Sequence, residues 1–335
     1  MAGERRRRKR SQPANTGGKV MLVIFSVMFV LSLGIYLNEK IFRLEFIPTS
    51  AEIMAVLGGG KKVTVAEGEI AVHYIDVGQG DCELIVAGET RVLIDSGEPE
   101  YSGRVINYIS SLGFRRLDYV IATHPHDDHI GGLAAIMEEF AVGKVIMPEI
   151  PEGILPTDKY FENMLDVIDR KNITAEYSRT GTEIQLGGGA VLRIVAPVHS
   201  DYASLNNFSI ACRLVHGERS FFFSGDIERA AESDIVNSGE YIRSDVLKVA
   251  HHGSTSSSTP AFLEAVMPEY AVIEVGEGNS YGHPKPEIVT RLHSLGAKIL
   301  TTMECGNIVI VSDGSELTVH TDNGYQEEVR TEEAA

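Results

Sequence analysis

Short apolar runs alternate with helical patterns from about residue 69 to about residue 320. Runs of β-branched and apolar residues bounded by turn residues predict strands, and apolar residues at three- and four-residue spacing predict helices. Predicted strands cover residues 71–75, 83–86, 91–94, 117–123, 209–216, 220–224, 245–250, 270–275, 298–301, 306–311 and 315–318. Predicted helices cover residues 105–112, 131–140, 159–170, 227–238, 259–266 and 286–295.

The order of these elements predicts an α/β fold. Gly-rich turns separate the first three strands, which we expect to form an antiparallel meander. The strands over residues 209–216 and 220–224 are expected to pair as a hairpin across Gly217 and Glu218. Two series of strands, each followed by helices, predict two sheets packed together with the helices outside.

The first 37 residues follow a different pattern. Residues 20–37 are apolar and uncharged, just long enough for a helix to cross a hydrocarbon core of about 30 Å. A core helix would carry a polar face, and a signal peptide would have a shorter apolar region with small residues at its exit. An uncleaved transmembrane anchor is therefore predicted. The expected divisions are a basic cytoplasmic tail (1–19), the anchor (20–37), a linker (38–68), the folded domain (69–320) and an acidic C-terminal tail (321–335).

Charge and cysteine content narrow the function further. The basic run at residues 5–10 is expected to stay in the cytoplasm, which places the folded domain outside the cytoplasmic membrane. The whole chain has a net charge of −17 although its N-terminus is basic. The rest of the chain is therefore acidic, which is not typical of a protein that binds duplex nucleic acid over a large surface. The cysteines, distant from one another, predict buried thiols and not a disulfide framework. They are Cys82, Cys212 and Cys305.

One loop carries four potential metal ligands at the spacing H-x-H-x-D-H, between a predicted strand and a predicted helix. Imidazole and carboxylate groups are the usual protein ligands of zinc and similar ions. If the loop begins extended, its first two histidines project to the same side and its last two ligands face a second ion at the turn. A solvated histidine-rich loop is the alternative, which this density of His and Asp disfavours. The four residues are His124, His126, Asp128 and His129.

Two further strand ends carry ligand types. Asp226 follows an apolar strand and precedes a helix, where it is suited to bridge two ions, to cap the helix, or to do both. His251 and His252 end another apolar strand. Strand ends that deliver such side chains into one crevice predict a shared metal site.

Five sequence blocks carry a family resemblance. They are DVGQGD (76–81), NNFS (206–209), SGD (224–226), LKVAHHGS (247–254) and YGHP (281–284). Together with the histidine loop they make residues 69–320 similar to the metallo-β-lactamase superfamily, and within it to the extracellular domain of ComEC competence proteins and their stand-alone relatives. The resemblance implies a four-layer αββα sandwich. ComEC proteins also have a multi-span channel, and the single predicted span here does not imply DNA uptake through a pore.

The resemblance implies a centre of two divalent metal ions, zinc or manganese. It makes Asp95 a structural aspartate beneath the loop, Asp226 the bridging carboxylate and His251 the late ligand, with His252 as its neighbour or in the reverse role. Most dinuclear members have another His between the loop and the bridging Asp. Here we expect Asn207 or Ser209 to line the pocket instead.

Two histidines lie in that interval, His199 and His216. His216 is expected to be solvated in its hairpin turn, whereas His199 is an alternative approach to the site. Asp76 and Asp81 flank a glycine turn and are expected to fix it by local hydrogen bonds.

Two ions about 3.5–4 Å apart acidify a bridging water and clamp the oxygens of an in-line displacement. Asp128 is expected to orient or deprotonate that water, and the Ser254 hydroxyl to hold a phosphate oxygen. Candidates to stabilise phosphoryl charge or to protonate the leaving oxygen are His252, Lys248 and His283. The alternatives are an outward side chain for Lys248 and a turn histidine held by its proline for His283.

The leading hypothesis is a membrane-anchored, extracytoplasmic hydrolase with two metal ions, acting on phosphodiester bonds of nucleic acid, in single strands more than in duplexes. A second hypothesis is hydrolysis of lactone, thioester or β-lactam bonds. A third is an anchored binding module without catalysis, which would have lost ligands that are present here. The predicted ligands are His124, His126, Asp128, His129, Asp226 and His251.

Overall fold

The computed structural model describes residues 25–34, 63, 65–324 and 326–329, and the chain divides into two units, Met1–Gly59 and Gly60–Ala335. In the first unit a helix covers residues 25–34. None of the helices in the described part of the chain is long and apolar enough to cross a membrane. The predicted tail over residues 1–19 lies outside the described residues, as do most of the predicted anchor and linker and part of the acidic tail.

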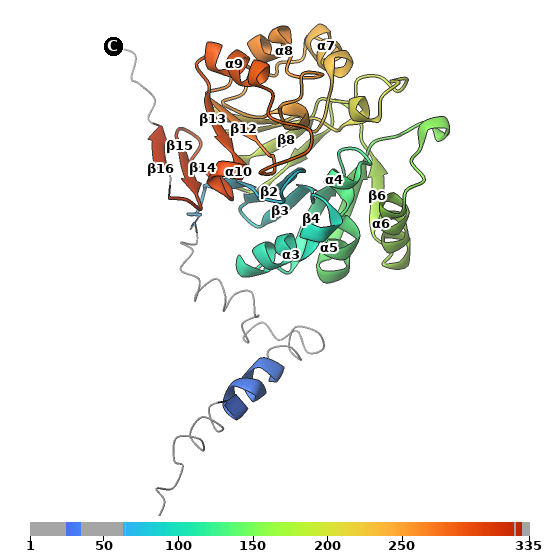
Figure 1. Cartoon of the computed structure of the whole chain (residues 1–335), viewed down its shortest axis with the longest axis vertical. Helices are drawn as coiled ribbons and strands as arrows, with labels where there is room; N and C mark the ends of the chain where they lie inside the picture. Colours follow the sequence, from blue (N-terminus) through green and yellow to red (C-terminus); the bar gives the residue numbers. More distant parts are fainter. Residues whose placement is uncertain (1–24, 35–62, 64, 325, 330–335) are drawn as a thin grey trace, which may run out of the picture. The chain divides into compact units, whose positions relative to one another are not determined.

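The second unit consists of two sheets packed face to face, with helices covering the outer surfaces (Figure 1). In spatial order the first sheet contains β16 (Gln326–Val329), β15 (Leu317–Thr321), β14 (Ile308–Ser312), β1 (Ile70–Tyr74), β2 (Cys82–Ala87), β3 (Thr90–Asp95), β4 (Arg116–Ile121), β5 (Ala141–Met147) and β6 (Thr174–Tyr177). The second contains β13 (Lys298–Thr301), β12 (Tyr270–Ile273), β11 (Val246–Lys248), β10 (Arg219–Phe223), β9 (Cys212–His216), β8 (Val191–Ile194) and β7 (Glu183–Gln185). The predicted two-sheet α/β architecture is confirmed.

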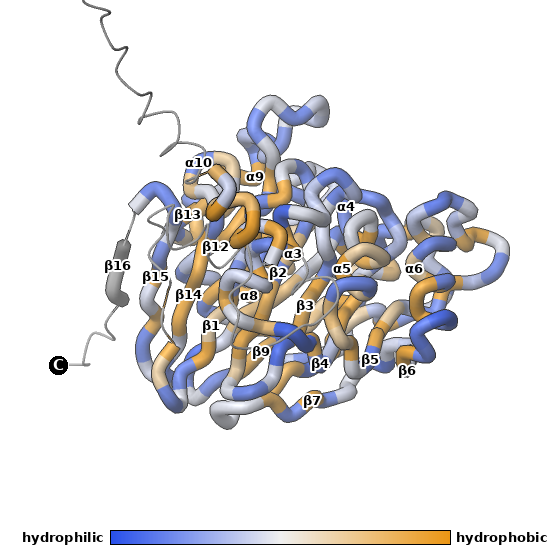
Figure 2. Tube along the Cα trace, turned by 90° about the horizontal axis from the view of Figure 1, so that it is seen from below, coloured by the Kyte–Doolittle hydropathy of each residue, from blue (hydrophilic) through white to orange (hydrophobic). Residues whose placement is uncertain are grey.

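Side chains from both sheets form the central core. Alternate residues of β1 point to opposite faces, so Val72 and Tyr74 enter this core while Ala71 faces the outer helices. The Tyr74 ring stacks on that of Phe223 from the second sheet, with centroids 6.4 Å apart. In Figure 2 hydrophobic residues are concentrated along central strands such as β1, β3 and β14.

Amphipathic helices complete the outer layers, and each buries its apolar stripe against a sheet. On the first sheet these are α3 (Ser102–Ser111), α5 (Leu133–Glu139) and α6 (Lys159–Arg170). On the second they are α7 (Arg229–Asn237), α8 (Pro260–Val266) and α9 (Pro286–Ser294). The Asp158 carboxylate caps α6 by accepting from the backbone N–H groups of Tyr160 and Phe161.

The opening meander and the β9–β10 hairpin are antiparallel, as predicted. The sequence patterns missed β5 to β8, and also β16, which lies within the predicted acidic tail. The strand β5 follows α5 almost directly, while β6 is wholly exposed and β7 has three residues. Short, exposed strands near a sheet edge lack the apolar run on which the prediction depends. From β3 to β6 and from β10 to β13 the strands are parallel, which gathers the loops at their carboxyl ends.

A buried histidine lies in the middle of β1. His73 Nδ1 is 2.8 Å from the Tyr108 hydroxyl of α3, and burial lowers the pKa of His73 from 6.5 to about 4. The unfolded chain therefore binds a proton between pH 6.5 and pH 4 that the folded chain does not bind. The free energy of unfolding therefore decreases as the pH falls through this window, by about 3 kcal/mol in all.

We expect His73→Gln to remove much of this pH dependence, because glutamine does not titrate. Urea unfolding at pH 7 and pH 4.5 measures it as the difference in unfolding free energy between the two pH values. His199→Gln, at an exposed histidine, is the matched control and should keep the wild-type difference. An undiminished difference in His73→Gln would contradict the assignment.

Candidate metal centre

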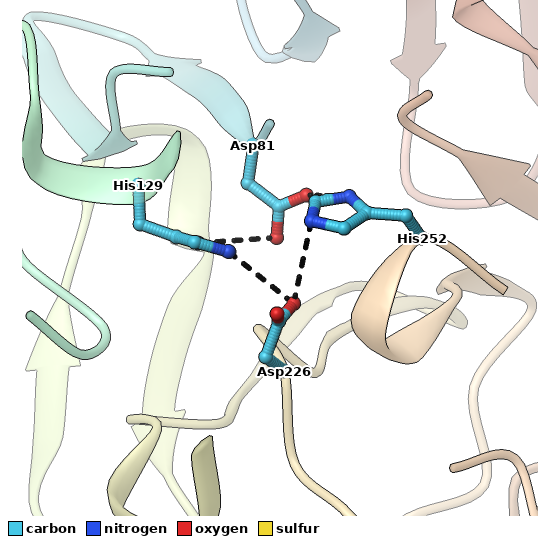
Figure 3. A group of neighbouring side chains, drawn as sticks. All are labelled: Asp81, His129, Asp226 and His252. Carbon is cyan, nitrogen blue, oxygen red and sulfur yellow. Dashed lines mark ion pairs between the residues drawn. The ribbon is translucent and has the colours of Figure 1, made fainter. Parts of the chain in front are cut away.

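The candidate site lies where loops at the carboxyl ends of several strands meet. The loop after β4 supplies the H-x-H-x-D-H residues and leads into the short helix α4 (Asp127–Ile130). The loop after β10 supplies Asp226, and the turn after β11 supplies His251 and His252. Figure 3 shows His129, Asp226 and His252 directed toward one another, together with Asp81 from the turn before β2.

Asp95 at the end of β3 holds the histidine loop from beneath. Its carboxylate accepts hydrogen bonds from the backbone N–H and the hydroxyl of Thr123, at 2.8 Å and 2.5 Å. His129 Nδ1 lies 2.7 Å from Asp95 Oδ2, the oxygen that also accepts from the Thr123 hydroxyl. Because Nδ1 is occupied in this way, His129 presents Nε2 to the centre. The position agrees with the structural role that the family resemblance implies for Asp95.

The first group of ligand atoms surrounds one oxygen of Asp226. His124 Nε2 lies 4.0 Å from Asp226 Oδ2 and 3.0 Å from His126 Nδ1. His251 Nε2 lies 3.6 Å from the same Asp226 oxygen. Ser256 Oγ, 3.0 Å from His251 Nδ1, fixes the orientation of that ring.

The second group surrounds the other oxygen of Asp226. Asp226 Oδ1 is 3.3 Å from His129 Nε2 and 3.8 Å from His252 Nε2. The Asp128 carboxylate joins them, with Oδ2 3.4 Å from His252 Nε2 and Oδ1 3.9 Å from His129 Nε2. One carboxylate thus presents one oxygen to each of two histidine-rich groups.

The residues present fit a metal ion. Three fully buried atoms that face one another, His129 Nε2, Asp226 Oδ1 and His252 Nε2, have no hydrogen-bond partner. Buried polar atoms without a partner cost free energy and require an explanation. Ligand atoms of Asp81, His129, Asp226 and His252 all lie within 4.8 Å of one another. A cation among them satisfies all of these atoms, and nitrogen and oxygen donors suit zinc or manganese.

The electrostatics of the site favour positive charge. Burial lowers the pKa of His252, but the carboxylates of Asp226 and Asp81 outweigh it and raise that pKa to about 10. Burial also lowers the pKa of His129, but the neighbouring carboxylates, Asp226 first, raise it well above its ordinary value. Burial raises the pKa of Asp226, but the neighbouring His129 and His252 hold it well below its usual range. Carboxylates that hold protons on two imidazoles are equally suited to hold a dication in their place.

The positions of Asp81 and Lys248 differ from two of the predictions. The Asp76 carboxylate fixes the glycine turn as expected, by accepting from the Gly78 N–H at 3.0 Å. Asp81 instead directs its carboxylate into the centre, 3.3 Å from His252 Nδ1, and pairs with the Lys248 ammonium. Lys248 is fully buried, so it neither points outward nor lies on the open side of the site.

Asn207 and Ser209 support the bridging aspartate from behind. Both are buried, and Ser209 Oγ accepts from the Asp226 N–H at 3.1 Å. Asn207 Oδ1 accepts from the N–H groups of Glu228 and Ala231 at the start of α7. Their polar atoms are bonded within the protein, in contrast to the predicted role in lining the pocket.

The two histidines between the loop and Asp226 belong to other parts of the surface and core. His216 is buried, with Nδ1 3.0 Å from Ser312 Oγ of β14. The prediction that it is solvated was wrong, because the hairpin turn packs across the neighbouring sheet. His199 is exposed and lies 3.7 Å from Asp234 of α7.

The remaining predicted residues lie at the rim. The His283 ring meets the His251 ring edge-on at 5.9 Å. Burial and the nearby histidines lower the pKa of His283 to about 4, so this ring is neutral at pH 7. Ser254 Oγ lies 3.1 Å from Ser256 Oγ, next to the His251 ring.

Several known proteins are similar to this chain in sequence. Residues 75–276 match the family model of the metallo-beta-lactamase superfamily. The chain is 30% identical over 261 residues to ComE operon protein 3 of Bacillus subtilis and 28% identical over 257 residues to Competence protein ComA of Neisseria gonorrhoeae. These alignments cover 72% and 76% of this chain but 33% and 34% of the relatives, so the chain spans about a third of their length.

A solved structure gives the same fold. CmlA, a diiron β-hydroxylase from Streptomyces venezuelae, superposes with a TM-score of 0.52 at 16% identity. The superposition covers 82% of this chain and 62% of that chain. At this identity the likeness concerns the fold alone.

The buried pair beneath the centre gives a stability prediction. Lys248→Met leaves the Asp81 carboxylate buried without its cation, and we expect a loss of about 3–5 kcal/mol in unfolding free energy. The double variant Asp81→Asn/Lys248→Met should recover a large part of this loss. Urea unfolding of the two single variants and the double variant measures the coupling.

Lys144→Met is the matched control, because Lys144 pairs with Glu176 at a partly exposed site and its loss should cost less than about 1 kcal/mol. Equal costs for Lys248→Met and Lys144→Met would show that the buried pair does not stabilise the fold.

Proposed function

Because the chain belongs to the metallo-β-lactamase superfamily, we propose that this hydrolase acts on phosphodiester bonds, with single-stranded nucleic acid as its substrate class. The observation that carries the proposal is the position of Asp226, which presents one carboxylate oxygen to each of two ligand groups. Such a pair of sites suits the displacement reaction of phosphodiesters, in which attacking and leaving oxygens both develop charge.

In this proposal each of the adjacent histidines belongs to a different site. His251 would supply the first ion with a third imidazole, the part that most dinuclear members assign to a histidine between the loop and the bridging aspartate. His252 would complete the second site. The first ion would be held by His124, His126, His251 and Asp226, and the second by Asp128, His129, His252 and Asp226.

When bound, a pair of divalent ions acidifies water and neutralises charge on the phosphoryl oxygens. The protein's own groups set the geometry. The Asp128 side chain is 21% exposed whereas Asp226 is 2% exposed, so Asp128 is the carboxylate that an incoming water meets. Asp128 accepts a hydrogen bond from that water and orients it. His283, neutral at the rim, donates a hydrogen bond to the leaving oxygen.

Several observations support the substrate class. The relatives that are similar to this chain in sequence include a protein named for competence. The net charge of −17 disfavours a long duplex, whose binding depends on many cationic contacts to phosphate.

The apolar stretch at residues 20–37 supports, from sequence alone, attachment of the domain to the outer face of the cytoplasmic membrane.

We expect the Mn²⁺- or Zn²⁺-loaded protein to cleave single-stranded DNA and bis-p-nitrophenyl phosphate. His126→Ala and Asp128→Ala should each lower the rate by at least about 100-fold, because each removes a group from the reacting centre. His199→Ala, at the exposed surface, is the control and should keep the wild-type rate. A metal-loaded protein that is inert on these substrates but opens lactones, thioesters or β-lactams would overturn the proposal.

The assignment of the two histidines predicts a metal count. Wild-type protein should retain two ions per chain after dialysis, while His251→Asn and His252→Asn should each retain one. Asparagine is the chosen replacement because both positions have positive φ, 51° and 52°, which asparagine tolerates. Elemental analysis gives the count, and Co²⁺ absorption spectra distinguish which site is lost.

His293→Asn, at an exposed position on α9, is the control and should retain two ions. Two tightly held ions in His251→Asn would remove His251 from the first site while leaving the second assignment intact.

A further inference from the structure

An exposed aromatic ring lies next to the candidate centre. Tyr281, in the segment between β12 and α9, is 61% exposed. Its ring stacks on the His283 ring with centroids 5.7 Å apart and planes 19° apart. Because His283 in turn contacts the His251 ring, three rings form a row from the solvent to the first ligand group.

The segment that carries Tyr281 is fixed by hydrogen bonds. The Asn279 side chain accepts from the His283 N–H at 3.0 Å and donates to the His283 carbonyl at 2.8 Å. The Lys285 ammonium donates to the Tyr281 carbonyl at 2.6 Å. The Lys285 N–H donates to the carbonyl of Gly253 at 2.9 Å, which ties the segment to the turn that holds His251. The ring is therefore pre-oriented, and a ligand that uses it loses little entropy in ordering it.

One side of this ring packs on His283, and most of the ring surface remains in water. An exposed aromatic face suits a nucleobase, whose flat ring stacks with little dependence on sequence. Only an unpaired base offers its face to a protein side chain in this way. The Lys285 ammonium beside Tyr281 supplies a positive charge in a chain whose net charge is −17.

We propose that Tyr281 is a stacking platform for a base next to the phosphate undergoing cleavage, and that it selects single strands among phosphodiesters. The inference rests on the proposed function and adds the determinant of its substrate. Base stacking supplies affinity that the acidic surface does not obtain from the phosphate backbone.

The test uses the full-length protein loaded with Mn²⁺ and two substrates of equal length. One is a single-stranded oligodeoxynucleotide, and the other has the same phosphate backbone with abasic tetrahydrofuran residues. Tyr281→Ala should raise the KM for the base-bearing strand about tenfold, the effect of losing one stacked base. It should leave the KM for the abasic strand and the metal content unchanged.

Two further variants serve as controls. Tyr281→Phe keeps the ring and should behave as wild type. Tyr241→Ala removes another exposed tyrosine, which lies in the loop before β11 and has the Arg213 guanidinium over its ring, and it should leave both KM values unchanged.

Each outcome is decisive. An unchanged KM of Tyr281→Ala for the base-bearing strand overturns the platform while leaving the phosphodiesterase proposal standing. Equal losses on both strands also overturn it, because they show that Tyr281 only maintains the loop. Wild-type protein that binds two ions but cleaves neither strand overturns the proposed function, and the platform with it.

Discussion

Charge balance among buried carboxylates is the constraint on which the centre depends. Asp81, Asp95 and Asp226 are all buried at one edge of the sandwich, where an uncompensated charge is very costly. Positive charge reaches them from Lys248 below and from the imidazoles of His129 and His252 at the centre. Two other acids are buried nearby. Burial and the charge of Glu274 raise the pKa of Glu83 well above its ordinary value, and burial and the Asp81 charge raise the pKa of Glu274 to about 8. A metal ion fits this arrangement because it supplies concentrated positive charge where two histidines now supply it.

The backbone turn after β11 allows two adjacent histidines to reach one carboxylate. In a strand, consecutive side chains point to opposite faces, so adjacent histidines would not reach one carboxylate. Here His251 and His252 both adopt left-handed conformations, with φ of 51° and 52°, which is uncommon for residues other than glycine. The turn places His251 Nε2 near one oxygen of Asp226 and His252 Nε2 near the other. Such local strain is retained where surrounding contacts fix it, and it is concentrated at functional sites.

Much of the fold was predictable because its cues are local. The helix over residues 159–170 has its apolar periodicity and its Asp158 cap within a few residues, and α6 has the same bounds. The meander and the hairpin followed from turns between apolar runs. Strands such as β6 were missed because their pairing partners, and not their own polar residues, define them.

The sequence alone predicted metal-binding chemistry at the histidine loop, since three histidines and an aspartate lie within six consecutive positions. The strand ends likewise predicted that Asp226, His251 and His252 share one crevice, and the structure brings their side chains together. The roles of Asp81 and Lys248 became visible in the three-dimensional structure, because these residues lie 167 positions apart in the chain and meet beneath the centre. The same holds for the separation of His251 from His252 and for the position of Tyr281 at the rim. These roles depend on which strand ends come together when the two sheets pack. The distances between those ends in space cannot be read from the spacing of the residues along the chain.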